Sequence, residues 1–328
     1  MARDERRKRT LASLSYFGGV ALSGATACSA THSLVLPLDV IKTRMQTDAT
    51  AAAGGFFAAS RALLSNAPGS GVFRLAAFFN GLPPTALGYF LQGATKFGGY
   101  ELLKQQTFAR LRETGGESAV SKWQLPVMLG SAATAEMAAT ILLAPLEVLK
   151  LRMQTDPSAA ARGVVRTFAQ ICRNEGIGQL YVGLAPIAMR QLPYTTAKLV
   201  VYELMSRGVQ RLDGRDERLR ACATALAGLV AGAASAIVSH PADLLLTRLC
   251  GSATATITTN VAECVIANGF ADQVRYLMSL GLRGAYAGIG PRLLMTAAMT
   301  SLQFSIYEAV RSGLGVMQTP PPAVLAPA

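Results

Sequence analysis

Acidic and basic side chains recur at a fixed spacing behind a proline in three apolar segments of the sequence. The segments are "LVLPLDVIKTRMQTD" (34–48), "LLAPLEVLKLRMQTD" (142–156) and a weaker copy, "IVSHPADLLLTRLC" (237–250). On an α-helix, residues three apart lie about 60° from each other, so an acid such as Asp39 and a base such as Lys42 share one face. Three helices with such pairs around a common axis can link an acid on one helix to a base on the next. This chemistry is that of a gate, a ring of ion pairs that closes and opens.

A simpler interpretation is that these residues are interfacial charges that snorkel from helix ends, as in most membrane proteins. The acid follows the proline by two residues in all three copies, at matching positions of a repeat. That regularity favours the ring of ion pairs. We expect each proline to bend its helix toward the ring.

The composition indicates a membrane protein that handles anions. Of 328 residues, 51% are hydrophobic and 15% are charged, and the mean hydropathy is +0.33, values shifted from soluble averages toward membrane proteins. The net charge of +12 is spread through apolar segments and loops, which favours contact with anions and anionic lipid over nucleic acid binding.

No pattern in the sequence indicates an enzyme, a cofactor or a metal site. We find no nucleophile elbow, phosphate-cradling loop or cluster of metal ligands. The cysteines form no CxxC pair, so they predict neither a zinc site nor a disulfide framework. They are Cys28, Cys172, Cys222, Cys250 and Cys264.

Three copies of one unit make up the chain, because the prolines at 37, 145 and 241 are spaced by 108 and 96 residues. In each copy a polar loop follows the charged cluster, and a second apolar segment then ends in "YELLK", "YELMS" or "YEAVR". Two helices per copy give six, each long enough to cross a bilayer, with both termini on one side. The predicted spans are about 15–46, 82–108, 122–155, 182–210, 218–250 and 289–315.

These motifs resemble those of the mitochondrial carrier family over residues 15 to 315. The family motif Px[DE]xx[KR] is matched at Pro37 and Pro145 and in part at Pro241, where Leu246 replaces the base. The second motif, [FY][DE]xx[RK], is matched in two copies, and Ser206 replaces its base in the remaining one. The resemblance implies an all-α membrane protein with six transmembrane helices in three tandem two-helix repeats and pseudo-threefold symmetry. The expected segments are a basic tail (1–14), repeats at 15–113, 120–212 and 218–317, and a Pro-rich disordered tail (318–328).

The resemblance also implies two gates and alternating access between them. The proline-end gate, expected on the matrix side, comprises Asp39, Lys42, Glu147, Lys150 and Asp243, with helix kinks at Pro37, Pro145 and Pro241. The termini-end gate, expected on the cytoplasmic side, comprises Glu101, Lys104, Glu203, Glu308 and Arg311. Cyclic pairing would join Asp39 to Lys150 and Asp243 to Lys42, and would leave Glu147 without a partner because of Leu246.

Counting back from the gates along each helix gives the positions that face the interior. Lys96, Arg190 and Lys198 would make the centre positive, which suits a small anion, and arginine offers a planar fork for carboxylate or phosphate. His32 and Glu136 are groups able to exchange protons. Met295 and Met299 have the same spacing, and we expect them to serve packing.

Several cavity segments resemble the phosphate-transporting members of the family, among them "THSLVLPLD" (31–39), "PPTALGYFLQGATKFGGYE" (83–101) and "LAPIAMRQLPYTTAKLVVYE" (185–203). This resemblance implies phosphate transport in the mitochondrial inner membrane, by proton symport or the thermodynamically equivalent hydroxide antiport. The implied substrate-binding residues are Gln92, Lys96, Arg190, Gln191 and Gln303, and the implied proton-coupling residues are His32 and Glu136.

The alternatives left open are a carrier of another small anion, such as a dicarboxylate, or of a copper complex, and a non-transporting membrane scaffold with the same fold. A monomer in contact with membrane lipid, cardiolipin above all, is the expected state. The first loop, "NAPGSGVFRLAAFFNG" (66–81), departs from the family pattern that "EGIGQLYVG" (175–183) retains. That departure weakens the expectation of a cardiolipin site in the first repeat.

Overall fold

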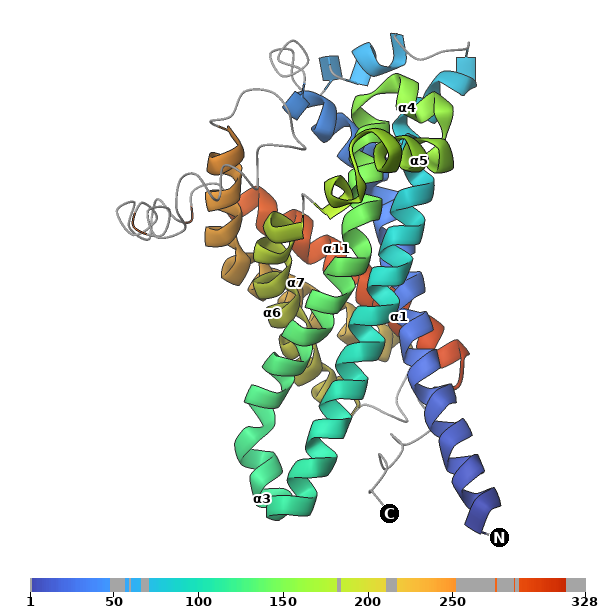
Figure 1. The fold of residues 1–328 in the computed structure, drawn as a ribbon. Coiled ribbons are helices and arrows are strands. Elements are labelled where there is room, and N and C mark those ends of the chain that lie inside the picture. Colours follow the sequence, from blue (N-terminus) through green and yellow to red (C-terminus); the bar gives the residue numbers. More distant parts are fainter. Residues whose placement is uncertain are drawn as a thin grey trace.

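Long helices dominate the chain. The computed structural model describes residues 2–47, 57–58, 60–65, 71–181, 184–210, 217–251, 275, 286 and 289–316. The long helices are α1 (Ala2–Thr47), α3 (Leu82–Thr155), α6 (Leu184–Gln210), α7 (Glu217–Gly251) and α11 (Ile289–Gly313) (Figure 1). The shorter ones are η1 (Gly71–Phe79), α4 (Pro157–Arg162), α5 (Val164–Asn174) and η2 (Ile177–Tyr181). All regular structure in these ranges is helical, which confirms the predicted all-α class.

The helix α3 contains two of the six predicted spans. Its first leg (82–115) and second leg (117–155) meet at Gly116, whose φ of 65° and ψ of −165° are not helical, and the two legs run back along each other (Figure 1). Glycine adopts a positive φ without the steric penalty that a Cβ atom brings. The short connection predicted between the first and second repeats is therefore a tight turn at this residue.

The first helix differs from the prediction at its start. The sequence predicts a tail (1–14) before a helix that begins at about residue 15, whereas α1 is helical from Ala2. Residues 2–14 contain neither proline nor glycine, so nothing in the backbone interrupts the helix there. The expected C-terminal tail (318–328) lies outside the described residues.

Three described helical stretches are long and apolar enough to cross a membrane: Ser13–Ile41, Arg74–Gln154 and Ala221–Pro241. The second is 81 residues long and includes both legs of α3, so it accounts for two spans. The helices α6 and α11 are also long enough, but polar residues such as Gln191, Lys198 and Gln303 lower their mean hydropathy. Such residues must face something other than lipid.

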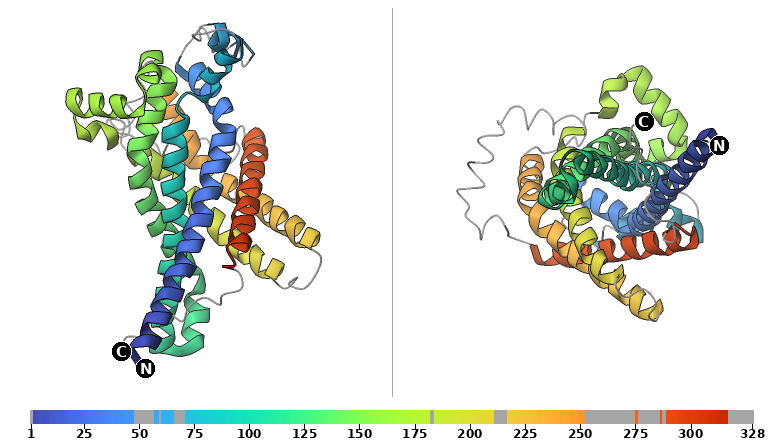
Figure 2. Two further views of the ribbon diagram at one scale, coloured as in Figure 1. Left: turned by 90° about the vertical axis from the view of Figure 1, so that its right-hand side faces the viewer. Right: turned by 90° about the horizontal axis from the view of Figure 1, so that it is seen from below.

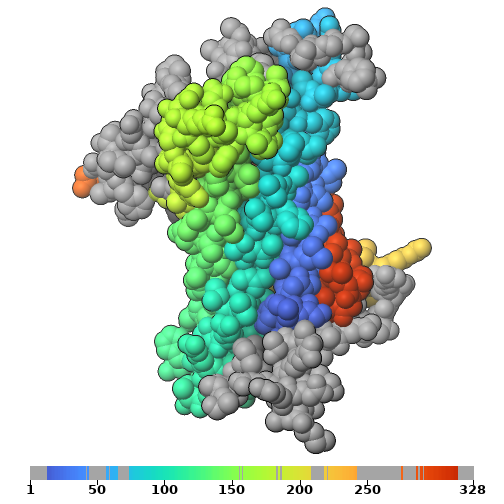
Figure 3. Space-filling model, turned by 45° about the vertical axis from the view of Figure 1, so that its right-hand side comes forward, coloured from blue at the N-terminus to red at the C-terminus, as the bar shows by residue number. Residues whose placement is uncertain are grey.

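The long helices close into a ring in chain order. The helix α1 packs on α3, α3 on α6, α6 on α7, and α7 on α11, which returns to α1. Figure 2 shows this ring from below, and Figure 3 shows α1 between α11 and the first leg of α3 along one flank. The C-terminal end of α11 reaches the start of the ring, since Val316 lies against Gly19 of α1. An axis enclosed by helices from all three repeats is the arrangement that the repeat pattern predicts.

Small residues set the helix spacing within two of the repeats. A Cβ atom built on Gly93 would lie 2.3 Å from the carbonyl oxygen of Gly24, so α1 and the first leg of α3 touch backbone to backbone. In the third repeat, a Cβ atom on Gly228 would lie 2.7 Å from the Cα of Ser301. Close approach at small residues is typical of helices packed in lipid, and here it fixes the depth of α1 relative to α3.

We predict that Gly93→Ala destabilises the protein, because the added methyl group meets backbone atoms that cannot move aside. The expected loss is at the upper end of about 1–3 kcal/mol, the range for overpacked sites, and thermal unfolding of the purified protein in detergent measures it. Gly130→Ala is the matched control, since a Cβ atom at this exposed glycine of α3 meets nothing within 4 Å. A Gly93→Ala protein as stable as the control would contradict the backbone contact.

Candidate functional site

A small cavity lies between α1, the first leg of α3, α6 and α11. Its volume is about 40 Å³, room for on the order of three water molecules. Most of its walls are polar, as the helical spacing predicts for residues that face a common axis. The lining residues are Thr31, His32, Gln92, Lys96, Gln191, Tyr194, Lys198, Met299 and Gln303.

A buried acid and base meet on one side of the cavity. The ammonium of Lys96 lies 3.6 Å from the carboxylate of Glu136, and the two side chains are 3% and 0% exposed. Gln92 and Thr140 both donate to the same carboxylate, at 3.2 and 3.3 Å. The legs of α3 therefore hold Glu136 through two hydrogen bonds and one ion pair, although this residue does not itself line the cavity.

The second buried base, Lys198, has neutral partners. Its ammonium donates to the amide oxygen of Gln303 at 2.8 Å and lies 4.9 Å from the centre of the Tyr194 ring. Gln303 in turn contacts the thiol of Cys28, 2.7 Å from its amide nitrogen. No carboxylate forms an ion pair with Lys198 among the described side chains. The sequence analysis placed Lys198 on the interior face but left it out of the binding set, and Cys28 was missed.

The ring of His32 is held from two sides. Its Nδ1 lies 2.9 Å from the carbonyl oxygen of Cys28, and the ring stacks on Tyr89 with 3.5 Å between centroids. Because a carbonyl only accepts, Nδ1 carries the hydrogen of this bond. Nε2 of the neutral ring is then the nitrogen that can accept a proton.

Arg190 lies outside the cavity that its spacing predicts it to share with Lys96. Its side chain is exposed, and it is not among the residues that line the cavity. On α6 the residues that line the cavity begin at Gln191, and Arg190 precedes them, nearer the N-terminal end of the helix. Arg190 therefore stands toward the proline end, outside the space lined by Lys96 and Lys198.

The proline-end gate has one of its predicted links between helices. Lys150 of α3 lies 3.2 Å from Asp39 of α1 and 3.4 Å from Glu147 on its own helix, so the predicted pairing of Asp39 with Lys150 is confirmed. Glu147, which the sequence leaves without its expected partner because of Leu246, shares this lysine. Thr43 adds a hydrogen bond to Gln154 at 3.0 Å.

The remaining link predicted at this end lies outside the described side chains, since it involves Lys42 and Asp243. The three prolines behind the acids, Pro37, Pro145 and Pro241, all lie inside helices. Each proline removes one backbone hydrogen bond from its helix, which allows the helix to bend there. The structure is therefore compatible with the expected kinks.

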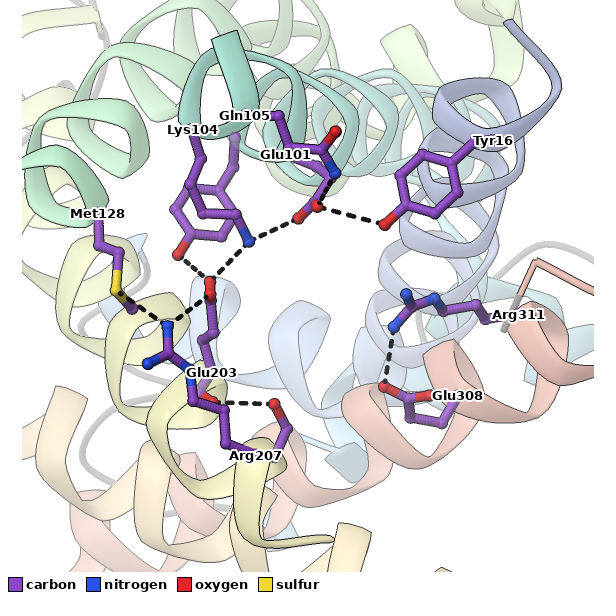
Figure 4. Close-up of polar contacts among 11 residues, drawn as sticks. Tyr16, Glu101, Lys104, Gln105, Met128, Glu203, Arg207, Glu308 and Arg311 are labelled. Carbon is purple, nitrogen blue, oxygen red and sulfur yellow. Dashed lines mark hydrogen bonds and ion pairs between the residues drawn. The ribbon is translucent and has the colours of Figure 1, made fainter. Parts of the chain in front are cut away.

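The termini-end gate surrounds the axis at the opposite end of the ring (Figure 4). Lys104 bridges Glu203 on α6 at 2.9 Å and Glu101 on its own leg at 2.7 Å. On α11, Arg311 pairs with Glu308 at 3.7 Å. The gate acids and bases predicted from the second motif therefore lie together.

Tyrosines support this gate, a role that the sequence analysis missed. The hydroxyl of Tyr100 donates to Glu203, and that of Tyr202 donates to Glu308 at 3.1 Å. Both residues are the aromatic position of the second motif, directly before an acid. The repeated aromatic residue was thus a usable signal, because a phenol beside a half-buried carboxylate is a hydrogen-bond donor.

The geometry describes a binding cavity between two sets of ion pairs. Lys96 and Lys198 bring two positive charges to the cavity and Glu136 brings one negative charge, in a water-poor interior where such charges interact strongly. The arrangement suits the binding of an anion in the middle of a membrane protein.

Comparison with known proteins identifies the repeats. The model of the family described as mitochondrial carrier protein matches residues 14–110, 123–212 and 217–317. "Mitochondrial substrate carrier family protein N" of Dictyostelium discoideum is 35% identical, over 89% of this chain and 93% of that protein. "Probable mitochondrial phosphate carrier protein" of Schizosaccharomyces pombe is 31% identical, over 93% of both chains. "Phosphate carrier protein, mitochondrial" of Caenorhabditis elegans is 34% identical, over 94% of this chain and 84% of its own length.

We predict that Asp39 and Lys150 stabilise the protein jointly. Asp39→Asn and Lys150→Gln should each lower the thermal stability in detergent, and the double variant should lose less than the sum, with a coupling on the order of 1 kcal/mol. The exposed pair Arg112–Glu117, whose side chains are 56% and 76% exposed, is the control and should show a coupling near zero. Additive losses at Asp39 and Lys150 would argue against a closed link.

Proposed function

The chain belongs to the mitochondrial carrier protein family, whose members are multi-pass transporters of the inner mitochondrial membrane and not enzymes, and on that premise we propose that its cavity carries inorganic phosphate together with a proton. The relatives named as phosphate carriers support this substrate. The observation that carries the proposal is the buried Lys198, whose partners in the described structure are neutral.

The charges of the cavity favour the binding of one net negative charge, counted over the anion and its proton, in each transport step. Two lysines and one glutamate sum to one positive charge when Glu136 is ionised. Dihydrogen phosphate would neutralise that charge directly. Hydrogen phosphate, with two negative charges, would do so once Glu136 took up a proton. In either case one proton accompanies each hydrogen phosphate, so binding is coupled to protons through the balance of buried charge.

The uncharged lining residues supply hydrogen bonds for the phosphate oxygens. Gln92 and Gln303 project from α3 and α11, and Gln191 and Tyr194 project from α6. Their amide and hydroxyl groups both donate and accept, which suits an ion that carries oxygens and one or two hydrogens. Arg190 would meet the anion on its way to or from the proline end, because its guanidinium stands outside the cavity on that side.

Transport would proceed by alternating access, with each gate opening in turn. A bound anion adds negative charge close to Lys96 and Lys198, and the gain is largest when the cavity excludes water. That gain would offset the cost of parting a gate ion pair. His32 and Glu136 would hold the accompanying proton, and net hydroxide movement in the opposite direction would give the same result.

We predict that the purified protein in liposomes takes up labelled phosphate along a pH gradient, alkaline inside. Lys198→Gln should raise the KM for phosphate about tenfold or more, because hydrogen bonds to a charged group contribute about 1.5–3 kcal/mol. Lys122→Gln is the matched control, since Lys122 is exposed near the turn of α3 and should leave uptake unchanged. Uptake of dicarboxylates without phosphate uptake would overturn phosphate as substrate, and no uptake of any anion would favour a scaffold.

A second prediction concerns the proton. Glu136→Gln keeps the hydrogen-bonding shape but removes the ionisable group, so this variant should lose the acceleration by a pH gradient. Exchange of internal for external phosphate, which needs no net proton movement, should persist at a reduced rate. Glu113→Gln is the control, because Glu113 is exposed and should respond to the gradient as the parent does. An unaltered gradient response in Glu136→Gln would remove Glu136 from the proton step.

A further inference from the structure

The termini-end gate is short of one base, and its structure shows how the other residues rearrange around that gap. At the position of the base on α6 stands Ser206, whose hydroxyl donates to the backbone carbonyl of Glu203 at 3.0 Å. Ser206 therefore makes no link from α6 to α11. The acid on α11, Glu308, takes its cation from its own helix, through Arg311 at 3.7 Å.

This pairing on α11 leaves Glu101 without the base of α11. Arg311 and Glu101 form no ion pair, although both side chains are described and face the same opening (Figure 4). The helix α1 lies between the two elements, since it packs on both α3 and α11. A side chain of α1 can therefore reach this sector of the gate, where Arg311 and Glu101 do not pair directly.

Tyr16 of α1 occupies that place. Its side chain is 5% exposed, and its hydroxyl donates to a carboxylate oxygen of Glu101 at 3.2 Å. The guanidinium of Arg311 lies on the same side of the gate as this phenol (Figure 4). Figure 4 shows the phenol reaching the gate from α1, opposite the side where Lys104 approaches Glu101.

The charges of the gate explain why a neutral donor fits there. Glu101, Glu203 and Glu308 bring three negative charges, and Lys104 and Arg311 bring two positive ones. Arg207, one residue after the serine, adds a third positive charge through Glu203 at 3.4 Å. The gate is then balanced, and a phenol adds a hydrogen bond to Glu101 without adding charge.

We propose that Tyr16 is a gate residue, which closes the sector between α3 and α11 in place of a direct pair between Arg311 and Glu101. The motifs on the even-numbered spans do not include this residue, since it lies on the first span. The role depends on alternation of the gate and not on which anion is carried. The proposal predicts that replacing Tyr16 weakens the closed gate because Ser206 supplies no base, and that a base at position 206 removes this effect.

The test measures access to the cavity through the thiol of Cys28. Cys28 is fully buried against Gln303, and it lies twelve residues from Tyr16 and eleven from Asp39, about 18 and 16 Å along a helix. In a protein whose other four cysteines are serine, the rate of labelling by a water-soluble maleimide in detergent reports gate opening. Tyr16→Phe should speed labelling roughly tenfold or more, the effect of a lost hydrogen bond to a charged group. Tyr181→Phe, at a tyrosine that is 40% exposed, should leave the rate unchanged.

A second substitution separates a gate role from simple loosening of the fold. Adding Ser206→Arg to Tyr16→Phe supplies a base for Glu308 and frees Arg311 to reach Glu101, so labelling should return close to the parent rate. Adding Ser206→Ala should not restore it. The thermal stability of the protein that keeps all its cysteines gives a second measurement. There, Ser206→Arg should restore stability lost in Tyr16→Phe, and Ser206→Ala should not. Equal labelling of Tyr16→Phe and the parent, or no difference between the two changes at Ser206, would overturn the proposal.

Discussion

A charge buried in an apolar bundle must be compensated inside that bundle, because bulk water cannot reach it. Lys198 is 2% exposed and meets this requirement only in part, through the dipole of Gln303 and the ring of Tyr194. Such partners stabilise an ammonium less than a carboxylate does. Under the proposed function, an anion in the cavity would complete the compensation, so the affinity for the substrate would come from the incomplete compensation of Lys198. Lys96 shows the contrast, since Glu136 already balances it.

The same constraint governs both ends of the ring. Lys104 and Lys150 each serve two carboxylates, one on their own helix and one on a neighbouring helix. When such a gate parts, the lysine keeps the acid on its own helix, which limits the cost of leaving a charge unpaired. Under the proposed alternating access, each gate would thus open without leaving its base unpaired. The tyrosines add hydrogen bonds from neutral donors to the gate carboxylates.

Much of this arrangement follows from sequence, because repeats and helical spacing are local properties. The six spans, the link between Asp39 and Lys150, and the interior faces that bear Gln92, Lys96 and Gln303 were all predicted. Spacing fixes the face of a residue but not its depth relative to other helices. Arg190 shares a face with Lys198 yet does not line the cavity, because its depth depends on how α6 packs between α3 and α7.

Contacts between different repeats were harder to foresee. The motifs predicted which even-numbered spans carry the termini-end gate, but the approach of Tyr16 to Glu101 depends on the position of α1 in the closed ring. Likewise, Cys28 and Gln303 stand 275 residues apart in the chain. A cysteine among small residues gives no local sign of such a partner.

The distribution of small residues bears on which parts of the ring can move. Within the first repeat, α1 and the first leg of α3 touch backbone to backbone at Gly24 and Gly93. Within the third repeat, α7 and α11 do so at Gly228 and Ser301. The gate contacts that join one repeat to another are instead side-chain hydrogen bonds and ion pairs, such as Lys104 with Glu203. Side chains at 3 Å separate by rotating about single bonds, whereas packed backbones separate only by opening a void. The packing therefore favours helix pairs of one repeat moving as units, with the gates parting at the boundaries between repeats.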